Sequence, residues 1–500
     1  MAAAPLLAIP PFPGARARAF AQSGGAGEGD WQGLLDALAR HQVGGAYWGR
    51  KVAGPARLDA ASWPVDADPW TLLGSAEEVI LPAEDPRAVL ALAAGTPLSL
   101  VGRNGKPQAV DPAALVTRHL TRWQWFDPFD GNPITALEAI ELCGFWRRSI
   151  EANQGIAAVL GFAHWKRPTV APLLWNGSET PFHRGVPTLA PGDRVAVWRS
   201  RLSKAQEKAL AGRRLMEVED GFIRSSGLGA DCVPPLSIVV DERGVHFDPT
   251  RPSELEDLLQ NADLPPDLVA RAAALRAAIV AGGLSKYENA APLRLERPGG
   301  ARRHILVPGQ VEDDRAVTSG GALASNLELL RRARDHAGPD AFVIYKPHPD
   351  VLAGHRRGLL SASDTAAYAD RVETEAPMAS LIDMVDELHV NSSLAGFEAL
   401  LRGKQVTVHG APFYAGWGLT TDLGAVPARR TRRRSLDELV AAALLLYPRY
   451  LDPETNLPCP AEVLVRRLTR REVRLDTNAR AVIAVRRLAG RTNRLLGRNS

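Results

Sequence analysis

Three short polar motifs, each directly after a short apolar run, constrain the fold of this 500-residue chain more than any other feature. The runs and their motifs are 304–307 with 307–314, 341–345 with 345–349, and 387–390 with 391–398. Two of the motifs lead directly into segments with helical periodicity, which is the β-loop-α pattern of a parallel sheet. Loops at the carboxyl ends of parallel strands converge on one crevice. The three motifs are therefore expected to lie together around a ligand.

The second and third motifs have the chemistry of a nucleotide-phosphate site. Lys346 and His348 lie on either side of a proline, so a stiff loop holds two cationic or donor groups. Ser392 and Ser393 precede an apolar helix and can cap its first turn, where anions bind. Glu398, one turn further on, can accept hydrogen bonds from ribose hydroxyls. Each feature alone is also typical of a simple cap or a solvated strand end, so the hypothesis depends on their combination.

Five motifs of the chain together resemble those of the capsule polysaccharide β-Kdo transferases. They are 219–225, 307–314, 346–349, 391–400 and 412–419, and the similarity covers about residues 150–470. Members of that family use CMP-Kdo to build a β-Kdo linker on a phosphatidylglycerol acceptor. The His-Pro and Ser loops also resemble the CMP-binding loops of bacterial sialyltransferases. The resemblance implies an α/β, GT-B-like fold in which two Rossmann-type domains face each other across a cleft that holds the donor.

The sequence predicts five regions. Residues 1–70 are rich in Gly, Ala and Pro and are expected to be poorly structured or irregular, and 71–150 to be the degenerate remnant of a transferase module. The other regions are an N-terminal Rossmann-like domain at 151–295, a CMP-sugar-binding domain at 300–425 and basic helices at 426–500.

An internal repeat supports the remnant hypothesis. Residues 78–95 resemble 387–403, and residues 125–133 resemble 450–458. Chance similarity between short αβ segments is the alternative. In the first copy residues 82–84 (Pro-Ala-Glu) replace the Ser loop, so catalysis is not expected there.

The first Rossmann-like domain is predicted to contain three strands, two helices and a hairpin. The strands are expected at 156–162, 194–198 and 215–219, the helices at 204–210 and 269–281, and the hairpin at 235–248 around a turn at 241–244.

Asp220 is the predicted nucleophile. It ends a strand, and Gly221 is expected to let the backbone turn sharply there. Retention of configuration is most simply achieved by two inversions through a covalent glycosyl-carboxylate, and the family resemblance implies that role for Asp220. Glu219 is interpreted as structural, as a general base or as an orienter of Arg224, and the sequence leaves these roles open.

Further residues complete the predicted substrate site. Lys166 and Arg199 follow strands and are expected to bind acidic groups of the donor or acceptor, with a solvated basic turn as the other interpretation of each. Gln310 and Tyr414 belong to two of the family-like motifs. No metal and no cofactor are expected, because no DxD element stands in a suitable loop and Lys346 and His348 can neutralise the phosphate instead.

Composition indicates a globular protein with two or three cores. Apolar residues make up 45% of the chain and charged residues 23%. The three cysteines are far apart, which excludes a disulfide framework or a CxxC metal site and favours a reducing cytoplasm. The opening residues are not expected to act as a signal peptide, and no apolar run approaches the roughly 20 residues of a membrane-spanning helix. A cytoplasmic protein is expected, either soluble or peripheral on the inner membrane.

The last segment is strongly basic. Residues 461–500 carry eleven arginines against three acidic residues, and interleaved apolar residues predict amphipathic helices lying on anionic lipid. Nucleic acid is not expected as a partner, because no aromatic interleaving accompanies the charge. A basic helix packed against the catalytic domain is the other interpretation.

Two functional hypotheses follow. In the first, the chain is a retaining glycosyltransferase that moves β-Kdo from CMP-Kdo to a Kdo-(lyso)phosphatidylglycerol-type glycolipid, alongside other capsule-assembly proteins. In the second, it is a non-catalytic capsule export or assembly factor that binds a CMP-sugar or glycan. The complete set of Asp220, Lys346, His348 and the Ser loop favours the enzyme.

Overall fold

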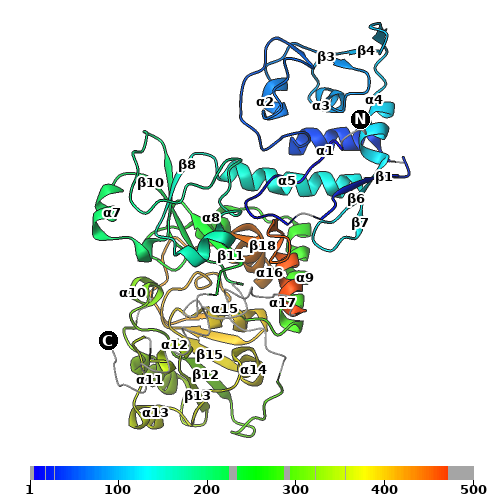
Figure 1. Cartoon of the computed structure of the whole chain (residues 1–500). Coiled ribbons are helices and arrows are strands. Elements are labelled where there is room, and N and C mark those ends of the chain that lie inside the picture. Colours follow the sequence, from blue (N-terminus) through cyan, green and yellow to red (C-terminus); the bar gives the residue numbers. More distant parts are fainter. Residues whose placement is uncertain are drawn as a thin grey trace. The chain divides into compact units, whose positions relative to one another are not determined.

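The computed structural model describes residues 5–16, 18–27, 29–223, 233–285, 293–320, 323–354 and 356–470. The chain forms two compact units. The first contains Met1–Ile156, Ala171–Pro181 and Glu454–Pro458, and the second contains Ala157–Val170, Phe182–Pro453 and Cys459–Ser500. The predicted site residues belong to the second unit, which is itself built on two sheets (Figure 1).

The first sheet of the second unit has six strands in the order β19-β18-β11-β10-β9-β8. Its strands are β8 (Ile156–Leu160), β9 (Arg194–Val197), β10 (Arg214–Asp220), β11 (Ser237–Asp241), β18 (Pro448–Leu451) and β19 (Pro458–Cys459). The three predicted strands and the helices α7 (Lys204–Ala209) and α9 (Pro266–Ala281) are confirmed. The predicted hairpin at 235–248 is wrong, because β11 pairs antiparallel with β10 and β18 and residues 242–248 form no strand.

The second sheet is a parallel sheet with the order β14-β13-β12-β15-β16-β17. Its strands are β12 (His304–Pro308), β13 (Phe342–Lys346), β14 (Arg371–Val372), β15 (Glu387–Val390), β16 (Gln405–Val408) and β17 (Thr421–Asp422). The helices between them are α10 (Arg315–Gly320), α11 (Asn326–Ala337), α12 (Pro349–Leu352), α13 (Ala362–Tyr368), α14 (Met378–Met384) and α15 (Leu394–Leu401). Every residue of β12, β13 and β15 is buried, as expected for central strands covered on both faces. The predicted β-loop-α pattern is therefore confirmed.

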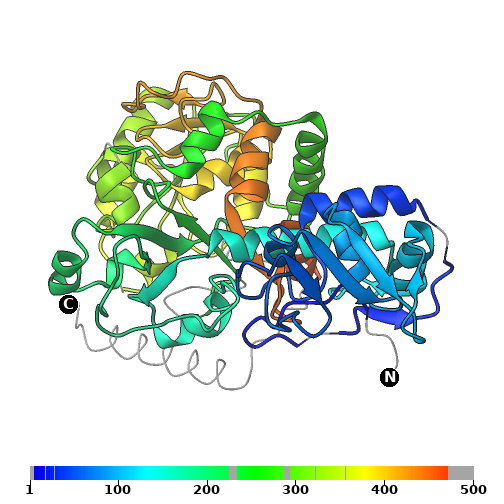
Figure 2. The ribbon, with the colours of Figure 1, turned by 90° about the horizontal axis from the view of Figure 1, so that it is seen from above.

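The chain returns from the second sheet to the first. After β17 it forms α16 (Leu436–Val440) and the π-helical turn η4 (Ala441–Leu446), and then adds β18 beside β11. Helix α16 packs side by side with α9, where Arg276 Nε donates to Asp437 Oδ1 at 2.7 Å (Figure 2). The two Rossmann-like halves are thus joined twice, and the predicted α/β, GT-B-like class with two facing domains is confirmed.

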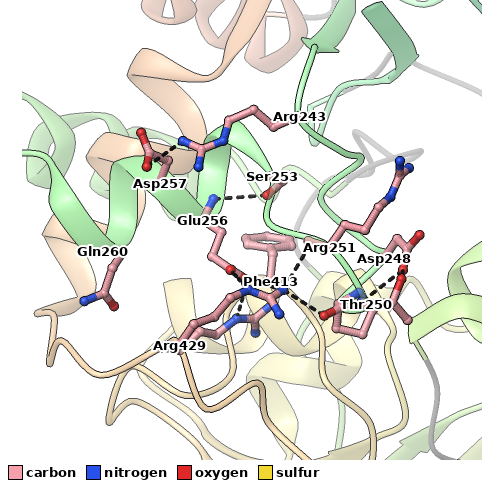
Figure 3. Close-up of polar contacts among 12 residues, drawn as sticks. Arg243, Asp248, Thr250, Arg251, Ser253, Glu256, Asp257, Gln260, Phe413 and Arg429 are labelled. Carbon is pink, nitrogen blue, oxygen red and sulfur yellow. Dashed lines mark hydrogen bonds and ion pairs between the residues drawn. The ribbon is translucent and has the colours of Figure 1, made fainter. Parts of the chain in front are cut away.

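The basic segment 429–434 lies against α8 (Glu254–Asn261) of the first half. Arg429 donates to Glu256 and to the main-chain oxygens of Pro249 and Arg251 (Figure 3). Arg430 is buried and donates to the same Glu256 carboxylate at 2.9 Å. A buried carboxylate shared by two guanidinium groups is fully paired, so this basic run is structural.

Helix α17 (Ala461–Thr469) packs on α9 and β18. Its Val465 and Leu468 side chains are buried, and Arg467 Nε donates to buried Asp452 at 2.9 Å. The part of the basic segment that the structure describes therefore packs against the protein. The prediction of a membrane-lying helix falls, for residues 471–500, outside the described residues. In the described part of the chain, every helix is too short or too polar to cross a bilayer.

The first unit contradicts the expectation of an irregular start. Helix α1 (Trp31–His41) lies within residues 1–70, α2 (Pro69–Leu73) begins there, and Leu6, Leu7 and Leu38 are buried. Four strands of this unit form a small sheet in the order β2-β3-β4-β5. Its strands are β2 (Arg57–Asp59), β3 (Glu78–Pro82), β4 (Leu98–Val101) and β5 (Pro107–Gln108), and α3 (Arg87–Ala93) lies between β3 and β4. After β5 the chain forms α4 (Pro112–Val116), η1 (Thr117–Thr121), β6 (Trp123–Phe126), β7 (Pro133–Ile134) and α5 (Ala136–Ala152).

The element order repeats along the chain. The series α4-η1-β6-β7-α5 corresponds to α16-η4-β18-β19-α17, and both series contain a π-helical turn. Helix α4 begins at 112 and α16 at 436, while α5 begins at 136 and α17 at 461, so the offsets are 324 and 325 residues. The agreement of five successive elements supports the internal repeat predicted from the sequence.

Candidate active site in the cleft of the second unit

A cavity of about 300 Å³ lies between the two sheets of the second unit. Its volume is at the small end of the range for ligand sites. Six predicted site residues line it: Glu219, Asp220, Gln310, His348, Ser392 and Ser393. The first two end strand β10 of the first sheet, and the others follow β12, β13 and β15 of the second. The structure therefore brings the carboxylates of one half opposite the polar loops of the other.

Asp220 is held by a buried lysine. Lys166 Nζ lies 3.3 Å from Asp220 Oδ1 and only 3.1 Å from the centroid of the Trp198 ring. The lysine is 6% exposed, so its charge is stabilised by a carboxylate and an aromatic face rather than by water. This pairing favours the ionised carboxylate. Lys166, predicted to bind substrate, thus contacts the predicted nucleophile directly.

Glu219 occupies a different electrostatic environment. Burial raises the pKa of its carboxyl to about 7, and neighbouring Asp220 adds to the rise while Arg315 opposes it. Arg315 Nη1 donates to Glu219 Oε1 at 2.9 Å, and its Nη2 donates to buried Glu217 at 3.1 Å. Two adjacent carboxyls with different environments are typical of an acid/base pair. Near neutral pH, Glu219 can therefore accept or release a proton.

Gly221 is required for space and not for a turn. Its φ is outside the left-handed region, so the bend that follows at residues 222 and 223 does not depend on the conformational freedom of glycine. A Cβ at this position would lie 2.2 Å from Ser237 Oγ, and the Gly221 N–H donates to the Ser237 carbonyl at 3.0 Å. The close approach of β10 and β11 therefore fixes the backbone next to Asp220.

The Ser loop is held in place by Gln310. The Ser392 N–H donates to Gln310 Oε1 at 2.9 Å, Gln310 Nε2 donates to Ser392 Oγ at 3.2 Å, and that hydroxyl donates to the Ala316 carbonyl. Ser393 caps α15, as predicted, because its Oγ accepts from the Ala395 N–H at 3.2 Å. The N-terminal end of α15 with its positive dipole therefore faces the cavity.

His348 has a defined hydrogen-bonding role in the His-Pro loop. Its Nδ1 accepts from the Asp350 N–H at 3.1 Å at the start of α12. A neutral imidazole in this arrangement carries its proton on Nε2 and is a donor there. This donor and the end of α15 suit an anionic group.

An aromatic wall crosses the cleft. Phe222 of the first half stacks on Phe413 of the second, with ring centroids 4.6 Å apart, and His246 contacts Phe222 edge-on at 4.8 Å. All three line the cavity, as does Arg356. The motif signals at 219–225 and 412–419 pointed to Phe222 and Phe413, whereas nothing in the sequence distinguished His246 or Arg356.

Several predicted site residues do not line the cavity. Lys346 is 6% exposed and its Nζ donates to the Ala376 carbonyl at 2.8 Å. Glu398 borders a separate small cavity, and Tyr414 is fully buried with its hydroxyl donating to the Ser393 carbonyl. Arg199 pairs with Glu217. Of these residues, Tyr414 contacts the Ser loop directly. Arg224 lies outside the described residues.

Comparison with known proteins gives one consistent answer. The capsule polysaccharide biosynthesis protein family matches residues 192–293 and 285–450. The chain is 37% identical over 360 residues to the capsule polysaccharide modification protein LipA of Neisseria meningitidis serogroup B (strain ATCC BAA-335 / MC58), with 69% of this chain and 50% of LipA covered. It is 41% identical over 326 residues to the lipopolysaccharide-processing protein LpsZ of Rhizobium meliloti, with 63% of this chain and 74% of LpsZ covered. The chain thus spans about half the length of LipA.

Two solved structures share the fold. The β-Kdo 2,4 transferase of Thermosulfurimonas dismutans KpsC is 31% identical to this chain with a TM-score of 0.54. The match covers 62% of this chain and 98% of the chain in that structure. The β-Kdo 2,7 transferase of the same protein is 31% identical to this chain with a TM-score of 0.51. The match covers 63% of this chain and 99% of the chain in that structure.

Proposed function

Because the chain belongs to the capsule polysaccharide biosynthesis family, we propose that its cleft transfers β-Kdo from CMP-Kdo to a Kdo-(lyso)phosphatidylglycerol-type glycolipid with retention of configuration. The observation that carries the proposal is the position of Asp220 opposite His348 and Ser393 around a single cavity. The similarity to two β-Kdo transferase structures at 31% identity supports the choice of sugar. The CMP donor follows from the resemblance of the loops and remains part of the proposal.

In the first step, an oxygen of Asp220 attacks the anomeric carbon of the donor. A bond forms between this oxygen and the carbon, and the bond from the carbon to the CMP phosphate oxygen breaks, so CMP leaves with the electron pair. Lys166 keeps Asp220 ionised before the attack. The His348 Nε2–H and the N-terminal end of α15 stabilise the charge on the departing phosphate.

In the second step, a hydroxyl of the acceptor attacks the same carbon and displaces Asp220. The product has the original configuration because two inversions have occurred. The hydroxyl proton passes to Glu219, whose pKa near 7 allows a large ionised fraction at neutral pH. Arg356, on the cavity wall, is the cation suited to the Kdo carboxylate. No step requires a metal ion.

We further propose that the protein works at the cytoplasmic face of the inner membrane, with other capsule-assembly proteins. A glycolipid acceptor places the reaction at a lipid surface. Binding of the full chain to vesicles with and without anionic lipid tests this part of the proposal. Equal binding to both kinds of vesicle would show that the basic C-terminal segment has no electrostatic role in membrane binding.

The experiment that tests the reaction combines CMP-Kdo, generated in situ, with a synthetic Kdo-lipid acceptor. Wild type is expected to extend the acceptor, and Asp220→Ala to lose transfer. Asp257→Asn changes an acidic residue on α8 that pairs with Arg243 outside the cavity, and it is expected to remain active (Figure 3). Binding of CMP-Kdo without transfer to any acceptor would instead identify a non-catalytic assembly factor.

Intact-mass measurement separates the two steps. Without acceptor, wild type is expected to gain the mass of one Kdo, whereas Asp220→Asn is not. An adduct that persists in Asp220→Asn would place the nucleophile elsewhere.

A further inference from the structure

A cluster of histidines and one carboxylate lies on the second sheet, away from the cavity residues. Glu387 and His389 are two residues apart on β15, so their side chains lie on the same face of the strand. His336 belongs to the last turn of α11, which packs on β15 (Figure 1). One ligand atom from each of the three residues lies within 4.8 Å of the other two. These are the residue types that bind zinc in His₂Glu sites.

His389 presents a buried nitrogen to this cluster. The residue is fully buried, and its Nε2 makes no hydrogen bond within the described part of the chain. The same atom lies 3.1 Å from Glu387 Oε1, close enough for contact but poorly aligned for a hydrogen bond. Two ligands of a tetrahedral zinc ion lie roughly 3.3 Å apart, given ligand distances of about 2.0–2.1 Å. The separation of the two atoms therefore matches a shared ion.

The surroundings orient both buried ligands. His389 Nδ1 lies 3.2 Å from His409 Nε2, so an Nδ1–H of His389 can donate there and leave the lone pair of Nε2 for an ion. Thr407 Oγ1 donates to Glu387 Oε1 at 2.7 Å and holds the carboxylate. Arg303 Nη1, 3.5 Å from Glu387 Oε2, engages the other oxygen. Such outer contacts are typical of metal sites.

We propose that His336, Glu387 and His389 bind one divalent first-row transition metal ion, with Zn²⁺ the best match, and that the ion has a structural role. Water fills the fourth position on the side of His336, which is exposed at the surface. The ion joins the end of α11 to β15. Since the Ser loop begins directly after β15, the ion would stiffen the base of one wall of the cleft. The prediction of a metal-free transfer is unaffected, because none of the three residues lines the cavity.

The test uses the full-length, tag-free protein after treatment with a chelator and dialysis. Calorimetric titration with ZnCl₂ is expected to show one saturable site per chain, and Co²⁺ in its place is expected to give the visible absorption of a tetrahedral complex. His336→Ala removes an exposed ligand and leaves the core intact, so it is expected to fold. Its zinc affinity should fall at least roughly tenfold, and Glu387→Gln should do the same with little change of shape.

His183→Ala is the matched control, because the His183 N–H that donates to Val159 is kept. It should bind zinc like wild type. Thermal unfolding adds a second readout: zinc should raise the Tm of wild type and His183→Ala more than the Tm of His336→Ala at the same concentration. Absence of a saturable site in wild type, or unchanged zinc affinity in His336→Ala, would overturn the proposal and leave a Glu-His-His hydrogen-bonded network. His336→Ala should retain transfer activity at low temperature, so this test is independent of the proposed reaction.

Discussion

Arg315 of the second half donates to Glu219 of the first half at 2.9 Å, and the same guanidinium reaches Glu217 at 3.1 Å. This contact joins the two sides of the cleft at the carboxyl group whose pKa is most relevant to proton transfer. Because Arg315 lowers the pKa of Glu219 against the effect of burial, it sets the pH range in which that carboxyl can act as a base.

Arg315→Gln is expected to shift the pH dependence of transfer. Removing the positive charge raises the pKa of Glu219 above about 7, so a smaller fraction is ionised at neutral pH and the acidic limb of kcat/KM for the acceptor moves to higher pH. The pH–rate profile measures this. Arg251 contacts Glu217 at 3.4 Å but not Glu219, so Arg251→Gln should leave the acidic limb unchanged. An unmoved limb in Arg315→Gln would show that another group titrates.

Glu219→Gln is expected to lower kcat by roughly 10²–10⁴-fold, the usual contribution of a general base. The acidic limb near pH 7 should disappear from the profile, because an amide cannot titrate. Donor affinity, measured by calorimetry with CMP, should change little. Full activity in this variant would make Glu219 a structural residue.

Gln310→Ala is expected to weaken donor binding. The Ser392 N–H would lose its acceptor and the Ser392 hydroxyl would lose the amide that donates to it, keeping only its bond to the Ala316 carbonyl, so the Ser loop would be less well ordered for an anionic ligand. A higher KM for the donor with a smaller change in kcat is the expected pattern. Gln260→Ala on α8, where the amide contacts Thr431, is the control and should match wild type (Figure 3). Equal KM values for both variants would argue against this role of Gln310.

Gly396→Ala is expected to destabilise the second half by roughly 1–3 kcal/mol, the usual cost of overpacking. An added Cβ would lie 2.3 Å from the Tyr414 hydroxyl, which also supports the Ser loop. Urea unfolding measures the change. Gly185→Ala, where a Cβ would meet no atom within 4 Å, should leave the midpoint unchanged. Equal midpoints would mean that Tyr414 moves away without cost.

Transfer is expected to proceed without magnesium. His348 and the end of α15 supply the positive potential at the proposed phosphate position. Initial rates should therefore be the same with EDTA or with MgCl₂ in the assay. A rate that falls with EDTA and is restored by magnesium, but not by zinc, would place a metal in the reaction.

The sequence alone was sufficient to predict the position of residues whose role depends on the local sequence pattern. Short-range periodicity predicts Ser393 as a cap and Asp220 at the end of a strand. The β-loop-α pattern predicts that the strands of the second sheet are parallel. The hairpin at 235–248 was wrong for a related reason. Asp241 does accept from the Arg243 and Gly244 N–H groups in a tight turn, but the segment after it leads to α8 instead of pairing back.

Contacts between distant segments could not be predicted. Lys346 has the position of a phosphate ligand in the sequence, yet its Nζ reaches the carbonyl of Ala376, thirty residues further along the chain. The stacking of Phe222 on Phe413 and the pairing of Arg315 with Glu219 depend on how two sheets face each other. Periodicity along one strand contains no information about such facing surfaces.

The return of the chain from the second sheet to add β18 to the first has a mechanical consequence. Two covalent connections, one leading from α9 to β12 and the other from β17 to α16, tether the halves at separate points. Because the second sheet is inserted between two parts of the chain that both build the first sheet, cutting the backbone at either connection alone leaves the two halves covalently joined through the other.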